Sequence, residues 1–288
     1  MATSAATLIE RLRLFLGDWP DLDTISASLT STGTTVTVAD TTIYAKNWLI
    51  EIDTELMLVT SLASGTTLSV RRGVRGSTAA THASAAGVLI NPRWSSRQML
   101  EALNVAIHAT WPYLYLPVVD ESITIATDTY EYTVPDMPSD SGQQIGRIAE
   151  VWIKVNGEVT FSPLKTGWRV LPGATQKIRF AAQMPVGATV RPVGWGPLAP
   201  LASTASSLDA DFPRHAEPVL LTMAADHLLM GSEAGRVRHD VGLIDGREQA
   251  NRVGSAMSAA NGLRTRFERQ LMAAALPPMA PHLEPWAG

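Results

Sequence analysis

The chain has 288 residues, a formal net charge of −4 and no cysteine, which excludes disulfide bonds, thiolate chemistry and cysteine-ligated zinc. The slight negative charge argues against a protein that grips nucleic acid, because such proteins displace counterions with clustered lysine and arginine. Only 17% of the residues are charged, against about 25% in an average protein. Either part of the surface is buried in subunit contacts, or the chain is a monomer rich in alanine, serine and threonine.

Membrane and export signals are missing from the sequence. No apolar run approaches the roughly 20 residues of a membrane span. Residues 1–7 lack the basic and apolar regions of a signal peptide. We therefore expect neither a membrane partner nor a cleaved leader.

The first predicted element is a short amphipathic helix over residues 5–16, within an N-terminal segment 1–20. Thr7 and Glu10 have the spacing of a capping box, in which two side chains satisfy the first free backbone N–H groups. Gly17 suits the left-handed conformation that often follows the last residue of a helix.

Residues 21–92 predict a small β module. Its strand candidates are short, alternate in polarity and are bounded by turn residues; they are residues 34–38, 48–52, 56–58, 67–70 and 87–90. Gly73 and Gly76 are expected to supply positive φ in a tight loop.

Arg71, Arg72 and Arg75 form the densest basic spot of the chain. Arginines can contact phosphates, but the aromatic residues that alternate with basic ones in single-stranded nucleic-acid sites are missing here. We interpret the three arginines as loop or subunit contacts.

The clearest helix lies within residues 93–116. Ser95 and Gln98 form a capping box at its start, and Pro112 should stop it, because proline has no N–H to donate. An apolar stripe runs along it at helical spacing: Leu100, Leu103, Ile107 and Trp111.

Residues 117–200 predict a β-sandwich-like module, preceded by a linker at residues 113–117. Its strand candidates are residues 122–125, 130–134, 150–155, 168–170 and 177–180. Asn156-Gly157 is a hairpin signal.

Residues 201–276 predict a C-terminal helical region. One helix should begin at Asp211 as N-cap and end at Gly231, and a last long helix should cover residues 240–275. The tail, residues 277–288, contains four prolines and should be extended. Trp286 in this tail is either disordered or anchored in a pocket of another chain.

Together these elements predict an α+β protein. A helical core, made of the N-terminal helix, the central helix and two C-terminal helices, would carry the small β module and the β-sandwich-like module. An extended proline-rich tail would follow.

No catalytic constellation has adequate spacing. Gly231–Gly235 places its serine one position too early for a nucleophile elbow, and phosphate-binding glycine loops and His-Glu-x-x-His are missing. Asp120 and Glu121 could be imagined as a glycosidase pair, but adjacent strand residues point to opposite faces. We therefore predict that the protein is not an enzyme and has no catalytic, cofactor or metal site.

Four tryptophans in or near the predicted strands could line a sugar-binding platform: Trp48, Trp152, Trp168 and Trp195. Large aromatic residues in strands are more often part of a core. Both interpretations stay open from the sequence, with the core favoured.

The order of these segments resembles a known family. Residues 50–59 and 68–82 with Gly87-Val88 resemble a β module that recurs in structural proteins of tailed bacteriophages, except that Gly76-Ser77 stands where Gly-Thr is usual. Residues 99–112 resemble the helix before the central β domain of phage head–tail adaptor proteins, also called neck or connector proteins. Residues 211–230 and 263–272 resemble the closing helices of these adaptors.

The resemblance implies a structural virion protein of the neck, made in the host cytoplasm. Such adaptors form a ring, usually a dodecamer, that binds the portal protein and neighbouring copies of itself. The ring extends the DNA channel, lets double-stranded DNA pass without specific binding, and joins the capsid to the tail or to a further neck protein.

Contacts with the portal or a neighbouring subunit are assigned to the last helix and the tail, where partners commonly dock in this family. The assigned residues are Arg264, Arg266, Phe267, Arg269, Leu271, Leu283 and Trp286. The alternative is a tail-tip or fibre-associated virion protein whose β module binds glycans. A glycan-degrading enzyme is the remote third hypothesis.

Overall fold

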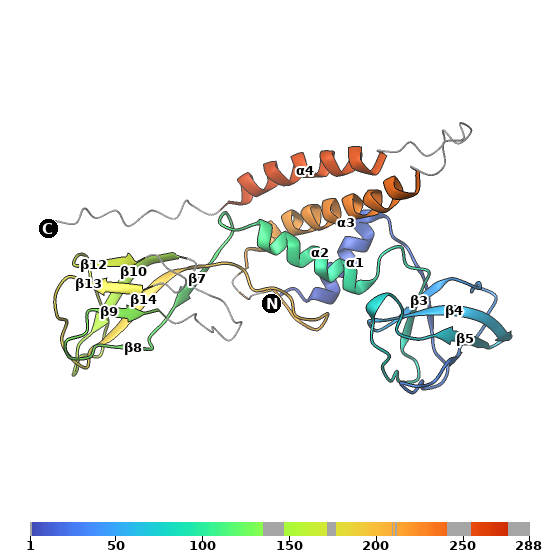
Figure 1. Ribbon diagram of the computed structural model, residues 1–288, viewed down its shortest axis with the longest axis horizontal. Coiled ribbons are helices and arrows are strands. Elements are labelled where there is room, and N and C mark those ends of the chain that lie inside the picture. The colour runs from blue at the N-terminus through green and yellow to red at the C-terminus, as the bar shows by residue number, and fades with distance from the viewer. Residues whose placement is uncertain are drawn as a thin grey trace.

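The computed structural model describes residues 2–134, 147–171, 177–208, 210, 212–240 and 255–275, without the side chains of residues 147, 232–240 and 255–259. This part of the chain forms 14 strands in three antiparallel sheets and only four α-helices. The helices lie in the middle of an elongated molecule, with a β module at either end (Figure 1).

The prediction of a helical core that carries the β modules is therefore wrong. The protein is mostly β, and each β module has a hydrophobic cluster of its own beside that of the helices. Amphipathic helices dominate the prediction because their 3.6-residue period is easier to detect in a sequence than short strands are.

The small β module is a six-stranded sheet with the strand order β1-β6-β3-β4-β5-β2. Its strands are β1 (Asp21–Thr24), β2 (Thr35–Thr37), β3 (Leu49–Ile52), β4 (Glu55–Ser64), β5 (Thr67–Arg71) and β6 (Gly87–Ile90), with a 3₁₀ turn, η1 (Val74–Gly76), after β5. Ile25 and Val38, which follow the two edge strands, form a β-bridge. The sheet thus curls into a half-barrel, whose two edge strands are linked by this single bridge, and alternate residues such as Ile50, Met57 and Val59 fill its interior.

The helices are α1 (Ala5–Leu16), α2 (Ser96–Ala109), α3 (Glu217–Asp240), which follows the 3₁₀ turn η2 (Arg214–Ala216), and α4 (Ser255–Ala274). Among the described residues, no helix is long and apolar enough to cross a membrane. The capping box of α2 is confirmed, and Gly17 ends α1 with a φ of 66°. The N-cap of α1 is Ser4, whose hydroxyl accepts a hydrogen bond from the Thr7 N–H, so Thr7 was the wrong choice.

Two helix ends differ from the prediction. The helix α3 continues through Gly231 to Asp240, because its contacts with α2 and α4 outweigh the weak helix propensity of one glycine. The last helix begins, among the described residues, at Ser255 instead of residue 240, and Asp211 lies outside the described residues.

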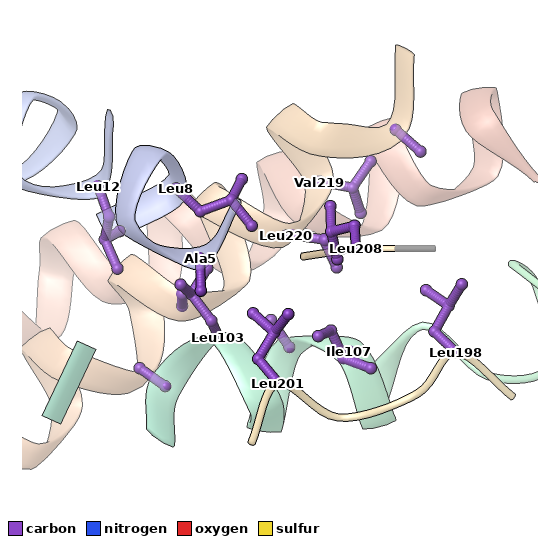
Figure 2. Close-up of a cluster of buried hydrophobic side chains, with 14 of the residues drawn as sticks. Ala5, Leu8, Leu12, Leu103, Ile107, Leu198, Leu201, Leu208, Val219 and Leu220 are labelled. Carbon is purple, nitrogen blue, oxygen red and sulfur yellow. The ribbon is translucent and has the colours of Figure 1, made fainter. Parts of the chain in front are cut away.

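The helices share a hydrophobic cluster with the segment that follows the second β module (Figure 2). Leu8 of α1, Leu103 of α2 and Leu220 of α3 are fully buried there. Leu201 from the returning segment enters the same cluster, and its backbone exchanges two hydrogen bonds with the Asn104 side chain, at 2.7 and 3.0 Å. The chain therefore leaves the helices, forms the second β module, and returns.

The second β module is a sandwich of two sheets around one apolar cluster. One sheet has the order β11-β10-β14-β7, with β8 also paired to β14, and the other has the order β12-β13-β9. The strands are β7 (Leu116–Val119), β8 (Ile123–Thr124), β9 (Glu131–Thr133), β10 (Arg147–Lys154), β11 (Ser162–Pro163), β12 (Trp168–Leu171), β13 (Lys177–Phe180) and β14 (Thr189–Gly196).

The strand β14, to which β10, β7 and β8 are paired, is not among the predicted strands. Pro192 hid it, since proline normally excludes a central strand. Pro192 lies where the partner of β14 changes from β8 to β7, and its carbonyl accepts from the Asp120 N–H at 3.1 Å. The missing N–H of Pro192 therefore faces this bend, where no ladder bond is required.

A buried polar network fixes the small β module to the helices. Glu51 of β3 is 1% exposed and accepts from the Ser96 N–H, the first of α2, at 2.9 and 3.1 Å. Arg13 of α1 donates to Asp18 at 2.6 Å, to the Trp94 carbonyl at 3.0 Å and to Glu51 at 3.4 Å. We call Arg13, Asp18, Glu51 and Ser96 the clamp.

Replacing Arg13 by alanine should destabilise the protein by about 3 kcal/mol, because two buried carboxylates lose their cation. Arg11→Ala, on the same helix, is the matched control. Arg11 pairs with Glu217, but its side chain is 48% exposed, so this change should cost less than about 1 kcal/mol. Urea unfolding followed by tryptophan fluorescence measures both, and equal losses would contradict the role of the clamp.

Candidate functional site

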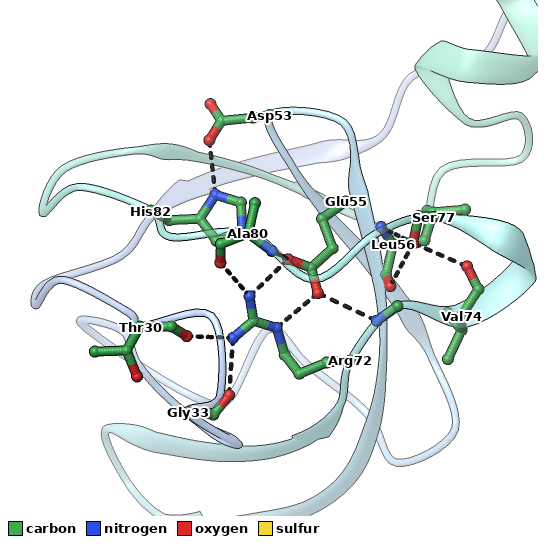
Figure 3. Close-up of polar contacts among 11 residues, drawn as sticks. Thr30, Gly33, Asp53, Glu55, Leu56, Arg72, Val74, Ser77, Ala80 and His82 are labelled. Atoms are coloured by element: carbon green, nitrogen blue, oxygen red, sulfur yellow. Dashed lines mark hydrogen bonds and ion pairs between the residues drawn. The ribbon is translucent and has the colours of Figure 1, made fainter.

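The three arginines of the predicted basic spot have two different environments. Successive strand residues point to opposite faces of a sheet, so Arg72 enters the half-barrel and Arg71 lies outside it. Arg72 donates two hydrogen bonds to Glu55, both 2.6 Å long. It also donates to the carbonyls of Thr30 at 2.7 Å and Gly33 at 2.8 Å (Figure 3). Arg72, which directly follows β5, thus contacts a loop 42 and 39 residues earlier in the chain. Its side chain is 8% exposed, so Arg72 is an internal residue.

Glu55 is the acceptor at the centre of this cluster. It is 2% exposed and also accepts from the N–H groups of Gly73 and Ala80 and from His82 Nε2, at 3.1, 2.9 and 2.9 Å. Burial raises the pKa of Glu55, but the bonds from Arg72, Ala80, His82 and Gly73 outweigh it and lower the pKa to about 2.

His82 completes the cluster. Its Nδ1 lies 2.7 Å from Asp53, whose carboxylate is exposed, and its Nε2 faces Glu55 (Figure 3). All donors and acceptors named here are already satisfied within the small β module. The cluster links β4 to the loops around it and leaves little capacity for a ligand.

Arg71 and Arg75 lie on the outer side. Both are exposed, and neither has a hydrogen-bond or ion-pair partner among the described residues. They border a hollow of about 360 Å³ on the outer face of β3, β4 and β5, which we call the arginine hollow. Its lining residues are Asn47, Leu49, Leu58, Arg71, Val74, Arg75 and Asn91.

The floor of the arginine hollow is one cross-strand row. Leu49 pairs with Leu58, and Leu58 pairs with Arg71, across three neighbouring strands. The two leucines are half-buried. Two cations that have no ion-pair partner among the described residues therefore lie beside an apolar floor, an arrangement that suits a carboxylate next to an apolar group.

The rim of the hollow holds three non-glycine residues in the left-handed region. Asn47, Arg75 and Asn91 have φ values of 69°, 53° and 50°. Asparagine tolerates this conformation, whereas for arginine it costs about 1 kcal/mol. Such strain concentrates at functional sites, so Arg75 is the residue at which we expect contact outside the subunit.

A second hollow of about 330 Å³ lies on the other side of Arg75, between η1 and the start of α2. Arg97 of α2 donates to the Gly76 carbonyl at 2.7 Å and pairs with Glu101 at 3.1 Å. The α2 helix thus fixes the loop that carries Arg75, and this hollow contains a carboxylate of its own.

The predicted contact residues of α4 also divide into two groups. Phe267 and Leu271 are 7% and 6% exposed and belong to the helical cluster of their own subunit. The arginines Arg264, Arg266 and Arg269 are exposed. Leu283 and Trp286 lie outside the described residues.

The other residues considered for chemistry are separated. Asp120 accepts from the Ser122 N–H at 2.7 Å, while Glu121 pairs with Arg191. Among the described residues, no group of three His, Asp or Glu side chains could hold a metal ion.

The four tryptophans do not share one face. Trp48 belongs to the small β module. Trp168 is 9% exposed in the sandwich core and donates to the Leu164 carbonyl at 2.8 Å. Trp152 donates to Glu150, and the Trp195 ring lies 4.7 Å from that of Tyr115.

Two features of the surface were not predicted from the sequence. The asparagines of the arginine hollow had one local signal, the turn dipeptide Asn91-Pro92. Residues 14–22 expose an unusual amount of apolar area: Leu14, Phe15, Trp19 and Leu22 are 55%, 38%, 73% and 74% exposed. We call these four the apolar segment.

Comparison with known proteins adds no assignment: neither a protein-family model nor a curated protein sequence matches this chain.

The low pKa of Glu55 predicts acid sensitivity of the small β module. A folded-state pKa below the ordinary value of 4.5 contributes stability above pH 4.5 and loses it as the pH falls toward 2. Glu55→Gln should therefore destabilise most at neutral pH, and its deficit should shrink by about 3 kcal/mol by pH 2. Denaturant unfolding of both proteins from pH 7 to 2 measures this, and a constant deficit would contradict it.

The strain at Arg75 predicts an inverted order of two substitutions. Arg75→Gly should be more stable than Arg75→Ala by about 1 kcal/mol, because only glycine adopts positive φ freely. The same pair at Arg71, which lies in a regular strand, is the control, and there alanine should be the more stable. Thermal unfolding of the four variants measures their stabilities. If the alanine variant were the more stable one at both positions, strain at Arg75 would be disproved.

Proposed function

We propose that this protein is a head–tail adaptor of a tailed bacteriophage. Its copies form a closed ring beneath the portal of the capsid, extend the DNA channel and join the head to the tail or to a further neck protein. The proposal rests on the order of segments that resembles this family and on the architecture of the subunit.

The observation that carries the proposal is the presence of two unlike surfaces on one subunit. A ring needs heterologous contacts, in which one patch of a subunit meets a different patch of the next. The arginine hollow offers two cations without partners among the described residues. The apolar segment exposes four large side chains within residues 14–22, and such exposure is typical of contact surfaces.

The electrostatics support a conduit better than a nucleic-acid-binding protein. A net charge of −4 does not favour tight binding to duplex phosphates. Arg72, Arg13 and Arg191 are committed to carboxylates within the subunit. DNA could therefore pass such a ring without being held.

Cryo-electron microscopy of intact particles tests the proposal. The expected result is a ring of this protein between portal and tail, fitted by the helices and both β modules. Density along the tail tube would contradict the proposal. Density at the tail tip would also contradict it and would support the alternative, a tail-tip or fibre-associated protein, for which a glycan-binding screen is the next measurement.

A further inference from the structure

The arginine hollow has the chemistry of a site for an acidic protein segment. It presents two guanidinium groups and two side-chain amides, and none of its lining residues is acidic. Arginine forks bind carboxylates through paired hydrogen bonds. The half-buried Leu49 and Leu58 form a floor on which an apolar neighbour of that carboxylate would lose water-exposed area.

Duplex DNA fits this site less well than a protein segment. Backbone phosphates repeat along an extended helix and are met by stripes of cations that reach outward. Here Arg71 and Arg75 flank one hollow of about 360 Å³, and beyond Arg75 the neighbouring hollow contains Glu101.

The chain itself contains a segment of the required chemistry. Leu283-Glu284-Pro285-Trp286 places one carboxylate between two large apolar residues. Trp286 lies twelve positions after Ala274 (286 − 274 = 12), and a fully extended chain of this length spans about 40 Å, so the segment could bind far from the end of α4. Because proline fixes φ, a proline-rich sequence loses less entropy on binding than other sequences do.

We propose that the arginine hollow of one copy binds the Leu283–Trp286 segment of a second copy, with Glu284 between Arg71 and Arg75. This inference rests on the proposed ring, in which each subunit meets two neighbours. It assigns the contact to named residues and explains why an arginine occupies a strained position.

A charge-swap experiment on the full-length chain tests the contact. The probe is a fluorescent peptide of residues 276–288, and its binding is measured by anisotropy. Arg71→Glu with Arg75→Glu should raise the dissociation constant at least about tenfold. Arg179→Glu is the matched control: Arg179 is an exposed arginine of the other β module, paired with Glu131, and its replacement should change nothing.

The reversed peptide separates a lost contact from a damaged fold. A peptide with Glu284→Lys should bind the unaltered protein at least about tenfold more weakly, and should regain affinity for the Arg71→Glu, Arg75→Glu protein. A misfolded protein could not regain affinity for a reversed charge.

Three results would overturn the inference: no binding of the peptide, equal binding by all variants, or binding of a short DNA duplex that needs Arg71 and Arg75 while the peptide stays free. The fate of the proposed function is separate. A neck ring in particles without peptide binding would reject only this contact. Peptide binding by a protein located elsewhere in the particle would reject only the adaptor.

Discussion

One buried carboxylate, Glu51, determines how the small β module meets the rest of the protein. Burial raises its pKa, in spite of the hydrogen bond from the Ser96 N–H and the charge of Arg13. A buried ion pair adds little net stability over apolar packing, but removing one partner is costly. The clamp therefore determines the orientation of the β module on the helices more than it increases the free energy of unfolding. Any other orientation would leave Glu51, Asp18 or Arg13 buried without a partner.

A buried ion pair also determines geometry inside the half-barrel, where Arg72 and Glu55 occupy a position that apolar side chains could otherwise fill. Arg72 reaches loop carbonyls that no strand partner satisfies, so its role depends on being buried. Arg71, one residue earlier, lies on the opposite face with no described partner. In a strand, a shift of one residue is enough to change an arginine from an internal brace to a surface group.

Local signals were predicted well because their physics is local. The capping box of α2 needs only Ser95 and Gln98, and the loop glycines Gly73 and Gly76 have the positive φ expected of them. The predominance of β structure over helices was not predicted, because strands such as β8 contain only two residues and depend on partners far along the chain. The predictions at Gly231 and Pro192 were wrong for the same reason. Contacts with residues distant in sequence determine the secondary structure there, against the intrinsic propensities of glycine and proline.

The sequence indicated where the candidate site lies but not which of its residues share one surface. The spacing of Arg71, Arg72 and Arg75 indicated a basic spot. The sequence alone does not show which of the three arginines is buried and which are exposed. Only the register that sets Leu49 beside Leu58 and Leu58 beside Arg71 shows that two of them border one hollow. Likewise, Asn47 and Asn91 are 44 positions apart (91 − 47 = 44) and meet only because β3 and β6 are neighbours.

The conformation of Arg75 connects stability with function. Between Gly73 and Gly76, a third glycine would adopt a φ of 53° without strain. Among the described residues, no hydrogen bond or ion pair of the arginine side chain offsets this cost. A side chain that weakens its own fold and points from a strained loop over an apolar floor is best explained by a contact outside the subunit. Under the proposed contact, the favourable interaction gained by Arg75 on binding would offset the cost of its backbone conformation, which the free subunit carries without compensation.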